Sequence, residues 1–217
     1  MPMTMFDRYL RALNETLLMV GISSVIAIVL GLLLAVTLVV TAADGFYPKP
    51  AFNKGLSIVV NMFRSVPFII LLVALIPVTR FIAGTTLGTW AAIVPLSVNL
   101  IPFYARIVQV SLLEVDKGLI EAAFAMGLRR HHIIWHVLLR ESLPAIIGGM
   151  TVCVVVMIGS SAMAGAVGAG GLGDLAIRYG YERYETKVLF DIIIILIVMV
   201  TIVQFTGEKL ARLVDHR

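Results

Sequence analysis

The sequence predicts an all-α integral membrane protein with five transmembrane helices and a short helix in a cytoplasmic loop. Composition is the first reason: 60% of the 217 residues are hydrophobic, 14% are charged, and the mean hydropathy is +1.02, far above that of a soluble domain. The second reason is a set of long apolar stretches. The third is a basic, helix-prone island from Arg106 to Pro144, which separates two of those stretches. We expect one transmembrane domain over residues 1–217.

Each predicted span is long enough to cross the hydrocarbon core, which takes about 20 apolar residues in a helix. Helices are expected because hydrocarbon offers no water to satisfy a bare backbone. No small-residue cleavage site follows the polar segment Met1 to Glu15, so we expect the first span to be retained. The five spans run from Thr16 to Ala42, Leu56 to Ile82, Thr89 to Val110, Leu143 to Val167 and Val188 to Gly207.

Orientation is predicted from the excess of Lys and Arg in cytoplasmic loops. If the Arg106 to Pro144 island is cytoplasmic, eleven Lys and Arg residues gather on that side and six on the other. An odd number of spans places the termini on opposite sides. The sequence therefore predicts an N-terminus outside and a C-terminus in the cytoplasm.

Breaks and polar groups in the second and third spans predict a water-lined pathway. Such groups persist within a membrane where neighbouring helices or a cavity satisfy them. Hydrogen bonds between helices, with no transport role, are the alternative for any single residue. The four prolines are Pro67, Pro77, Pro95 and Pro102, and the candidate pathway residues are Asn61, Arg64 and Asn99, with Arg106 at an edge.

A glycine-rich run ends the fourth predicted span. Small residues at this spacing let helices approach closely, or let a helix bend into an ordered loop, so packing or gating is expected. The letters also fit the dinucleotide fingerprint GxGxxG, but that motif must follow a strand and here an apolar span precedes it. Ser161 and Met163, just before the run, are candidates for a gate, although methionine also fills gaps in ordinary packing. The glycines are Gly165, Gly168, Gly170, Gly171 and Gly173.

The sequence shows no residue pattern that is typical of a catalytic site or a metal site. His132 and His136 share a helix face beside His131, but no HExxH pattern surrounds them, and solvated histidines at a partner surface explain them better. Cys153 is the only cysteine, which excludes internal disulfides and thiolate metal sites. No GxxxxGK[ST] phosphate loop is present, so any ATP must be handled by another subunit. We expect no metal and no cofactor on this chain.

The cytoplasmic island, about residues 111–144, has the character of a docking surface. Gly127 allows a turn after a small apolar helix face, and Arg129 and Arg130 supply charge for an acidic partner. A peripheral helix lying on lipid is the alternative, but its alanines bury little area there. The apolar face comprises Leu119, Ala122, Ala123 and Met126.

Glu121, Ala122 and Ala123 followed by Gly127 resemble the EAA loop of permease subunits of bacterial ABC importers. That pattern has a Pro where this chain has Arg140, and a Leu143-Pro144 pair follows four residues after Leu139. Arg can continue a helix that Pro would have shaped, so the turn at the end of the loop is left open while the docking helix itself matches. The resemblance implies that the loop docks into a cleft of an ATPase subunit. The coupling residues it implies are Glu121, Ala122, Ala123, Ala125, Met126 and Gly127.

The likeness narrows to the permeases of methionine importers, most specifically in the run from Ser161 to Gly173. It implies a type I importer made of two copies of this chain, two ATPase subunits that bind ATP and Mg, and an external substrate-binding lipoprotein. Membrane lipid is an expected partner and nucleic acid is not. Three rivals remain: the same class with another amino acid or small solute, an ion-coupled secondary transporter, and a membrane enzyme. Asp191 is the only acid well placed for ion coupling, and no internal repeat is visible.

Overall fold

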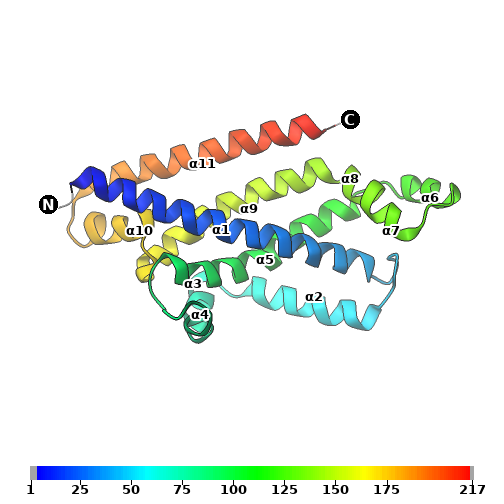
Figure 1. The fold of residues 1–217 in the computed structure, drawn as a ribbon, viewed down its shortest axis with the longest axis horizontal. Coiled ribbons are helices and arrows are strands. Elements are labelled where there is room, and N and C mark those ends of the chain that lie inside the picture. The colour runs from blue at the N-terminus through cyan, green and yellow to red at the C-terminus, as the bar shows by residue number, and fades with distance from the viewer. Residues whose placement is uncertain (1–3, 216–217) are drawn as a thin grey trace.

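Four long helices lie side by side and form the body of the molecule (Figure 1). The computed structural model describes residues 4–215, and those residues form helices, turns and loops without a strand. Helix α5 is central: it packs along α1 and against α9, while α9 also contacts α1 and α11. The four are α1 (Met5–Val40), α5 (Thr89–Leu113), α9 (Leu143–Ala164) and α11 (Thr186–Val214).

These four helices are long and apolar enough to cross a membrane, which agrees with four of the five predicted spans. The boundaries differ at two of them. Helix α1 begins at Met5 rather than Thr16, because Thr4 and Asp7 form a capping box: Asp7 N donates to Thr4 Oγ1 at 3.2 Å, and Thr4 N donates to Asp7 Oδ2 at 3.0 Å. Helix α11 runs past the predicted Gly207 to Val214.

The predicted second span, Leu56 to Ile82, is three helices rather than one. Helix α2 ends at Ser65 because Val66 is extended (φ −84°, ψ 125°), as the residue before a proline prefers. Helices α2 and α3 meet at 105°, which makes them a broken span or a re-entrant loop. The pieces are α2 (Pro50–Ser65), α3 (Phe68–Ala74) and α4 (Ile76–Ala83).

The sequence analysis expected breaks at Pro95 and Pro102, but the third span is not broken at either proline. Both are buried inside α5, which continues past each of them as one helix. The centre of this helix is the core of the molecule, since Leu96, Leu100 and Tyr104 have no exposed surface.

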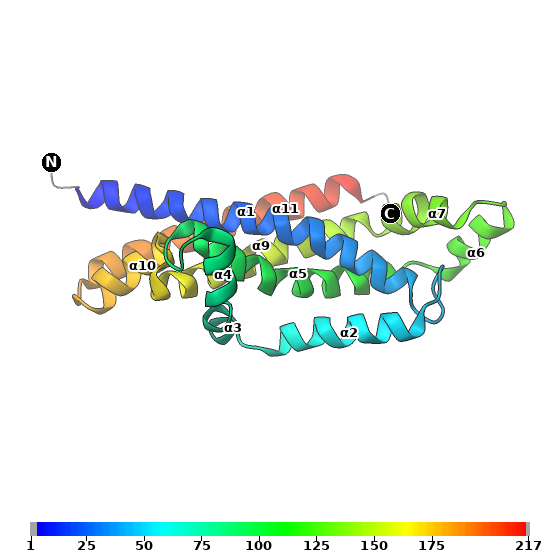
Figure 2. The ribbon, with the colours of Figure 1, turned by 60° about the horizontal axis from the view of Figure 1, so that its bottom comes forward.

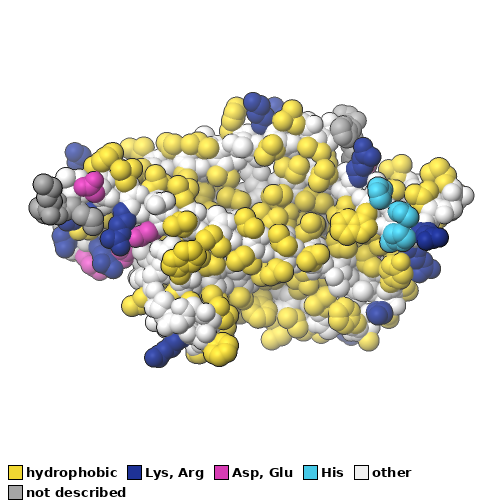
Figure 3. All heavy atoms as spheres, viewed as in Figure 1, with side chains coloured by type: hydrophobic (Ala, Val, Ile, Leu, Met, Phe, Trp, Pro, Cys, Tyr) yellow, Lys and Arg dark blue, Asp and Glu magenta, His cyan; other side chains and the backbone are white. Residues whose placement is uncertain are grey.

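Apolar side chains cover the flank of the bundle and charged ones gather at its two ends (Figure 3). Of α11, only Val188, Ile192 and Gly207 are buried, so most of its apolar surface faces outward. The start of α1 and the end of α11 lie at opposite ends, and the loop helices α6 (Lys117–Ala125) and α7 (Arg130–Ile133) lie at the α11 end (Figure 2). This belt between two charged ends is the pattern of a membrane-spanning bundle.

Candidate functional site

Helix α6 projects the predicted coupling residues away from the bundle. Asp116 starts the helix by accepting a hydrogen bond from Gly118 N at 2.7 Å. Ala123 is only 2% exposed and anchors the helix to the body. The other predicted coupling residues are exposed: Glu121, Ala122, Ala125, Met126 and Gly127. The apolar face therefore divides, with Ala123 turned inward and Met126 free for a partner.

Gly127 ends α6 in the way that the sequence indicated. Its φ is +79°, a left-handed value that favours glycine. Leu128 N donates to Ala123 O at 3.2 Å, and Gly127 N donates to Phe124 O at 2.9 Å. Together these bonds form a Schellman motif, which fixes the direction in which the chain leaves the helix.

The loop between α1 and α2 holds α6 against the body, which the sequence analysis missed. The Phe46 ring stacks on Phe124 with centroids 6.0 Å apart, and Phe46 O accepts a hydrogen bond from Arg130 Nη1 at 2.6 Å. The Arg130 guanidinium also lies 5.5 Å from the centre of the Tyr47 ring. Arg130 is therefore turned toward its own chain rather than toward a partner. The only sequence signal was an aromatic pair, Phe46 and Tyr47, in a loop flanked by apolar spans.

Replacing Phe46 by alanine should loosen the α6–α7 segment. Phe46 is 9% exposed and borders a cavity of about 440 Å³, so truncation enlarges a void and removes the stacked ring. The loss is about 3 kcal/mol, or roughly a hundredfold in the local opening equilibrium. Tryptic cleavage between Lys117 and Arg130 in the detergent-purified chain measures it. Phe52, which is 54% exposed on α2, gives the matched control, and equal cleavage in F46A and F52A would contradict the anchoring role.

The chain stays helical through Arg140, which answers the question that the missing proline left open. The segment after α7 is a π-helical stretch, η1 (Ile134–Leu138), followed directly by α8 (Leu139–Glu141). Pro144 then lies in the first turn of α9, where a missing backbone donor costs nothing. The loop thus returns to the membrane as nearly continuous helix.

The three histidines form a surface cluster on α7 and η1. The ring centres of His131 and His132 are 4.1 Å apart, and those of His132 and His136 are 5.8 Å apart. The neighbouring charge of His131 lowers the pKa of His132, which favours its neutral form. Residues 4–215 hold no group of three or more His, Cys, Asp or Glu side chains placed to bind a metal ion.

The glycine-rich run breaks the fourth span and reverses the chain. After α9 the chain passes through η2 (Gly165–Ala169) into the short helix α10 (Gly171–Leu175) and then η3 (Ala176–Tyr181). Gly168, Gly170 and Gly171 have φ of +91°, +83° and +79°. A Cβ on Gly165 would lie 2.5 Å from Asp174 N, so α9 and α10 touch at the backbone. Three of these glycines therefore shape the turn, and Gly165 and Gly173 allow close packing.

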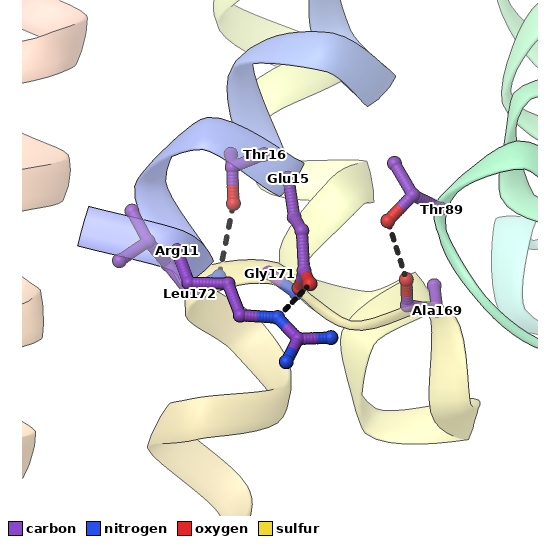
Figure 4. Close-up of polar contacts among 7 residues, drawn as sticks. All are labelled: Arg11, Glu15, Thr16, Thr89, Ala169, Gly171 and Leu172. Carbon is purple, nitrogen blue, oxygen red and sulfur yellow. Dashed lines mark hydrogen bonds and ion pairs between the residues drawn. The ribbon is translucent and has the colours of Figure 1, made fainter. Parts of the chain in front are cut away.

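Helix α1 supplies the polar groups that cap α10 (Figure 4). Glu15 Oε2 accepts from Gly171 N at 2.8 Å, and Thr16 Oγ1 accepts from Leu172 N at 2.9 Å. From the other side, Thr89 Oγ1 donates to Ala169 O at 3.5 Å. The turn is thus held between the starts of α1 and α5, which lie 156 and 80 residues away along the chain, so no local pattern reveals the contact.

Replacing Thr16 by valine should destabilise this turn without changing its volume much. Thr16 is 2% exposed, so the variant leaves Leu172 N buried and unpaired, at about 1–3 kcal/mol. Deuterium uptake at residues 170–175 should rise by one to two orders of magnitude in rate. Thr37, whose hydroxyl donates to Leu33 O at an exposed site, is the matched control. Unchanged uptake in T16V would show that the cap does not hold the turn.

The candidate pathway residues lie on three helices and are not joined to one another within residues 4–215. Asn61 and Arg64 are exposed in the last turns of α2, which packs against α5, the helix that carries Asn99. Met163 is 53% exposed near the end of α9. Ser161 is buried and donates to Ile158 O at 2.7 Å, within its own helix. Arg64 belongs to the last turn of α2 rather than to a loop, and α2 runs from the α6 end toward the middle of the bundle (Figure 2).

Comparisons with known proteins agree with this arrangement. A model of the binding-protein-dependent transport system inner membrane component family matches residues 27–217. A Vibrio cholerae protein named probable D-methionine transport system permease protein MetI is 48% identical over 97% of this chain and 94% of its own length. The methionine import system permease protein MetP of Bacillus subtilis is 43% identical over 83% of this chain and 81% of its own length.

A solved structure extends the likeness to the whole fold. A chain from the MetNI methionine ABC transporter, described as inward facing, is 42% identical, with a TM-score of 0.96 and full coverage of both chains. Family match, full-length relatives and fold agree, and the chain therefore belongs to the family of binding-protein-dependent transport system inner membrane components.

Proposed function

We propose that this chain is the membrane permease subunit of an ABC importer that carries methionine across the bacterial inner membrane. The observation that carries the proposal is the full-length match in sequence and fold to the MetNI chain, at 42% identity and a TM-score of 0.96. Relatives named for methionine or D-methionine transport support the cargo. The subunit is not itself an enzyme, because ATP, with Mg, is hydrolysed by a separate subunit of the transporter. Family membership excludes the ion-coupled and enzymatic rivals.

The working unit is a homodimer with two ATPase subunits and an external binding lipoprotein. Four long spans and a broken one enclose too little space for a pathway by themselves, and closed two-fold pairing is the common solution. The apolar surface of α2 supports this, since only Val60 of that helix is buried within the chain. In the dimer we expect the broken α2–α3 span and Asn61, Arg64 and Asn99 to face the partner copy across the pathway.

Coupling runs through α6. ATP-driven closure of the ATPase pair moves the exposed face from Glu121 to Gly127, and the Schellman turn with the Phe46 anchor passes that motion to α1 and α2. The pathway then opens toward the binding protein, and hydrolysis reopens it inward. Likeness to an inward-facing transporter supports taking the present conformation as the inward-facing state. Met163 and Ser161, next to the glycine turn, are the proposed gate.

The N-terminus is proposed to lie outside and the C-terminus in the cytoplasm. Helices α6 and α7 must be cytoplasmic if they meet an ATPase, and α11 ends on their side of the bundle (Figure 1). The beginning of α1 and helix α10 then face outward, where the binding protein delivers its cargo.

Reconstituted transport tests the proposal. The chain is placed in lipid vesicles with its ATPase subunit, and methionine uptake is measured with and without the binding protein and internal ATP. Uptake that requires all three proteins and ATP is the expected result. If the complex assembles and hydrolyses ATP but takes up neither methionine enantiomer, the chain is still a permease subunit, and its transported solute is another small molecule. Failure of the ATPase to assemble would refute the docking role of α6.

A further inference from the structure

A cavity of about 870 Å³ lies at the end of the bundle opposite α6, and the proposed mechanism does not use it. Its walls come from the first turns of α1, the start of α5, the glycine turn and η3. Four guanidinium groups face two carboxylates there, so two positive charges are not offset. The charged lining residues are Arg8, Arg11, Arg178 and Arg183 with Glu15 and Asp174.

Both carboxylates are already paired. Arg11 Nε donates to Glu15 Oε1 at 2.9 Å, and the other oxygen of Glu15 caps α10. Arg178 Nε donates to Asp174 Oδ1 at 2.8 Å. In residues 4–215, no carboxylate oxygen lies within 4.0 Å of the Arg8 or Arg183 guanidinium. The unmatched charge of the cavity therefore belongs to Arg8 and Arg183.

One tyrosine ring holds these two cations together. The Arg8 guanidinium carbon lies 5.0 Å from the centre of the Tyr179 ring, and that of Arg183 lies 4.5 Å from it. Arg8 also donates a hydrogen bond to the Tyr179 hydroxyl. The ring attracts both cations but does not neutralise either. An anion that contacts both guanidinium groups would offset their charge and accept several charge-assisted hydrogen bonds.

The cavity changes from cationic to apolar along the direction of the bundle. Arg8, Arg11, Glu15 and Leu18 line it at three- and four-residue spacing on one face of α1. Leu18 is the innermost of the four and Trp90, 66% exposed, lines the same space. Exposed Tyr181 and Tyr184 lie on the neighbouring segment, where interfacial aromatics mark the headgroup level. Figure 3 shows the same change from a charged end to an apolar flank.

We infer that this cavity binds an anionic phospholipid, with its phosphate bound by Arg8 and Arg183 and the start of its acyl chains against Leu18 and Trp90. Free phosphate shares the headgroup chemistry but makes no use of the apolar wall. An acidic side chain from another protein would likewise leave Leu18 and Trp90 without a role. The inference requires only that the bundle spans a membrane and does not depend on the cargo.

Native mass spectrometry of the detergent-purified transporter tests the site. Retention of dioctanoyl phosphatidylglycerol is compared with that of dioctanoyl phosphatidylcholine, and inorganic phosphate is added as a competitor. The test variant is R8Q/R183Q. R183Q alone is a second test variant that is expected to fold normally, because Arg183 lies on the exposed segment between η3 and α11 and makes no hydrogen bond to residues 4–215. The matched control is R80Q, an exposed arginine on α4 outside the cavity.

Phosphatidylglycerol should be retained by the wild type and R80Q, and binding should be weaker by on the order of tenfold in R8Q/R183Q and by a smaller factor in R183Q. Displacement by equimolar phosphate would overturn the lipid assignment and identify a soluble anion as the occupant. Equal retention by all variants, or equal retention of phosphatidylcholine, would overturn the inference. So would a variant that loses affinity for the binding lipoprotein while keeping the lipid.

Discussion

Replacing Gly127 by valine is expected to reduce methionine uptake about tenfold or more while the permease stays folded. Gly127 has φ of +79°, and a β-branched residue there is strained by about 1–2 kcal/mol, enough to favour another chain direction after α6. No atom lies within 4 Å of a Cβ at this position, so crowding does not contribute. Uptake into vesicles, measured beside ATP hydrolysis in the same preparation, gives the result: hydrolysis should persist with far less transport.

Gly84 provides a matched control for this variant. It ends α4 with φ of +72°, and a Cβ there also meets no atom within 4 Å. G84V therefore carries the same backbone strain at a helix end for which no coupling role is proposed. If G84V and G127V lose uptake equally, strain alone explains the effect and the coupling role of Gly127 is refuted. Unchanged uptake in G127V would refute it directly.

Replacing Gly173 by alanine is expected to lower the stability of the transporter by about 3 kcal/mol, or roughly 10 °C in its unfolding midpoint. A Cβ on Gly173 would overlap the carbonyl oxygen of Ala162 and lie 2.6 Å from its Cα. These are backbone atoms of α9, so α10 must move away as a unit and carry the glycine turn with it. Methionine uptake should fall together with stability.

The control is Gly159, on α9, where an added Cβ meets nothing within 4 Å. Helix propensity alone predicts that alanine raises the stability at both positions by about 1 kcal/mol. Packing predicts that G173A lowers the stability whereas G159A raises it. Thermal unfolding of G173A and G159A in detergent decides between them. A stabilised G173A would show that α9 and α10 separate easily, and the turn would then be a loose hinge rather than a packed one.

The fold class followed from composition and span length, because a chain this apolar has few alternatives to a helical bundle. Four spans came out close to their predicted places. The second did not, since α2 and α3 together are apolar enough to count as one span while the backbone turns by 105° between them. Pro95 and Pro102 carried the same local signal without a break, so a proline marks a weak point and the neighbours of the helix decide its effect.

The candidate site divides in the same way. The exposed α6 and its Gly127 turn were predicted, because a helix face and a C-terminal glycine are local patterns. Phe46, which holds α6 in place, was missed, since its partners Phe124 and Arg130 lie about 80 residues further along the chain. The pathway role of Ser161 stays a prediction, as its hydroxyl is used inside its own helix in the single chain.

The sequence by itself determined the class of the protein, four of its five spans, the exposed loop helix α6 and the glycine-rich turn, all of which rest on residue type and short spacing. Only the tertiary structure decided which groups meet across the bundle: Glu15 and Thr16 on α10, Phe46 on Phe124, and Arg8 with Arg183 on Tyr179. Each of these contacts joins residues far apart in the chain, and such pairing is set by how the helices pack rather than by any local preference.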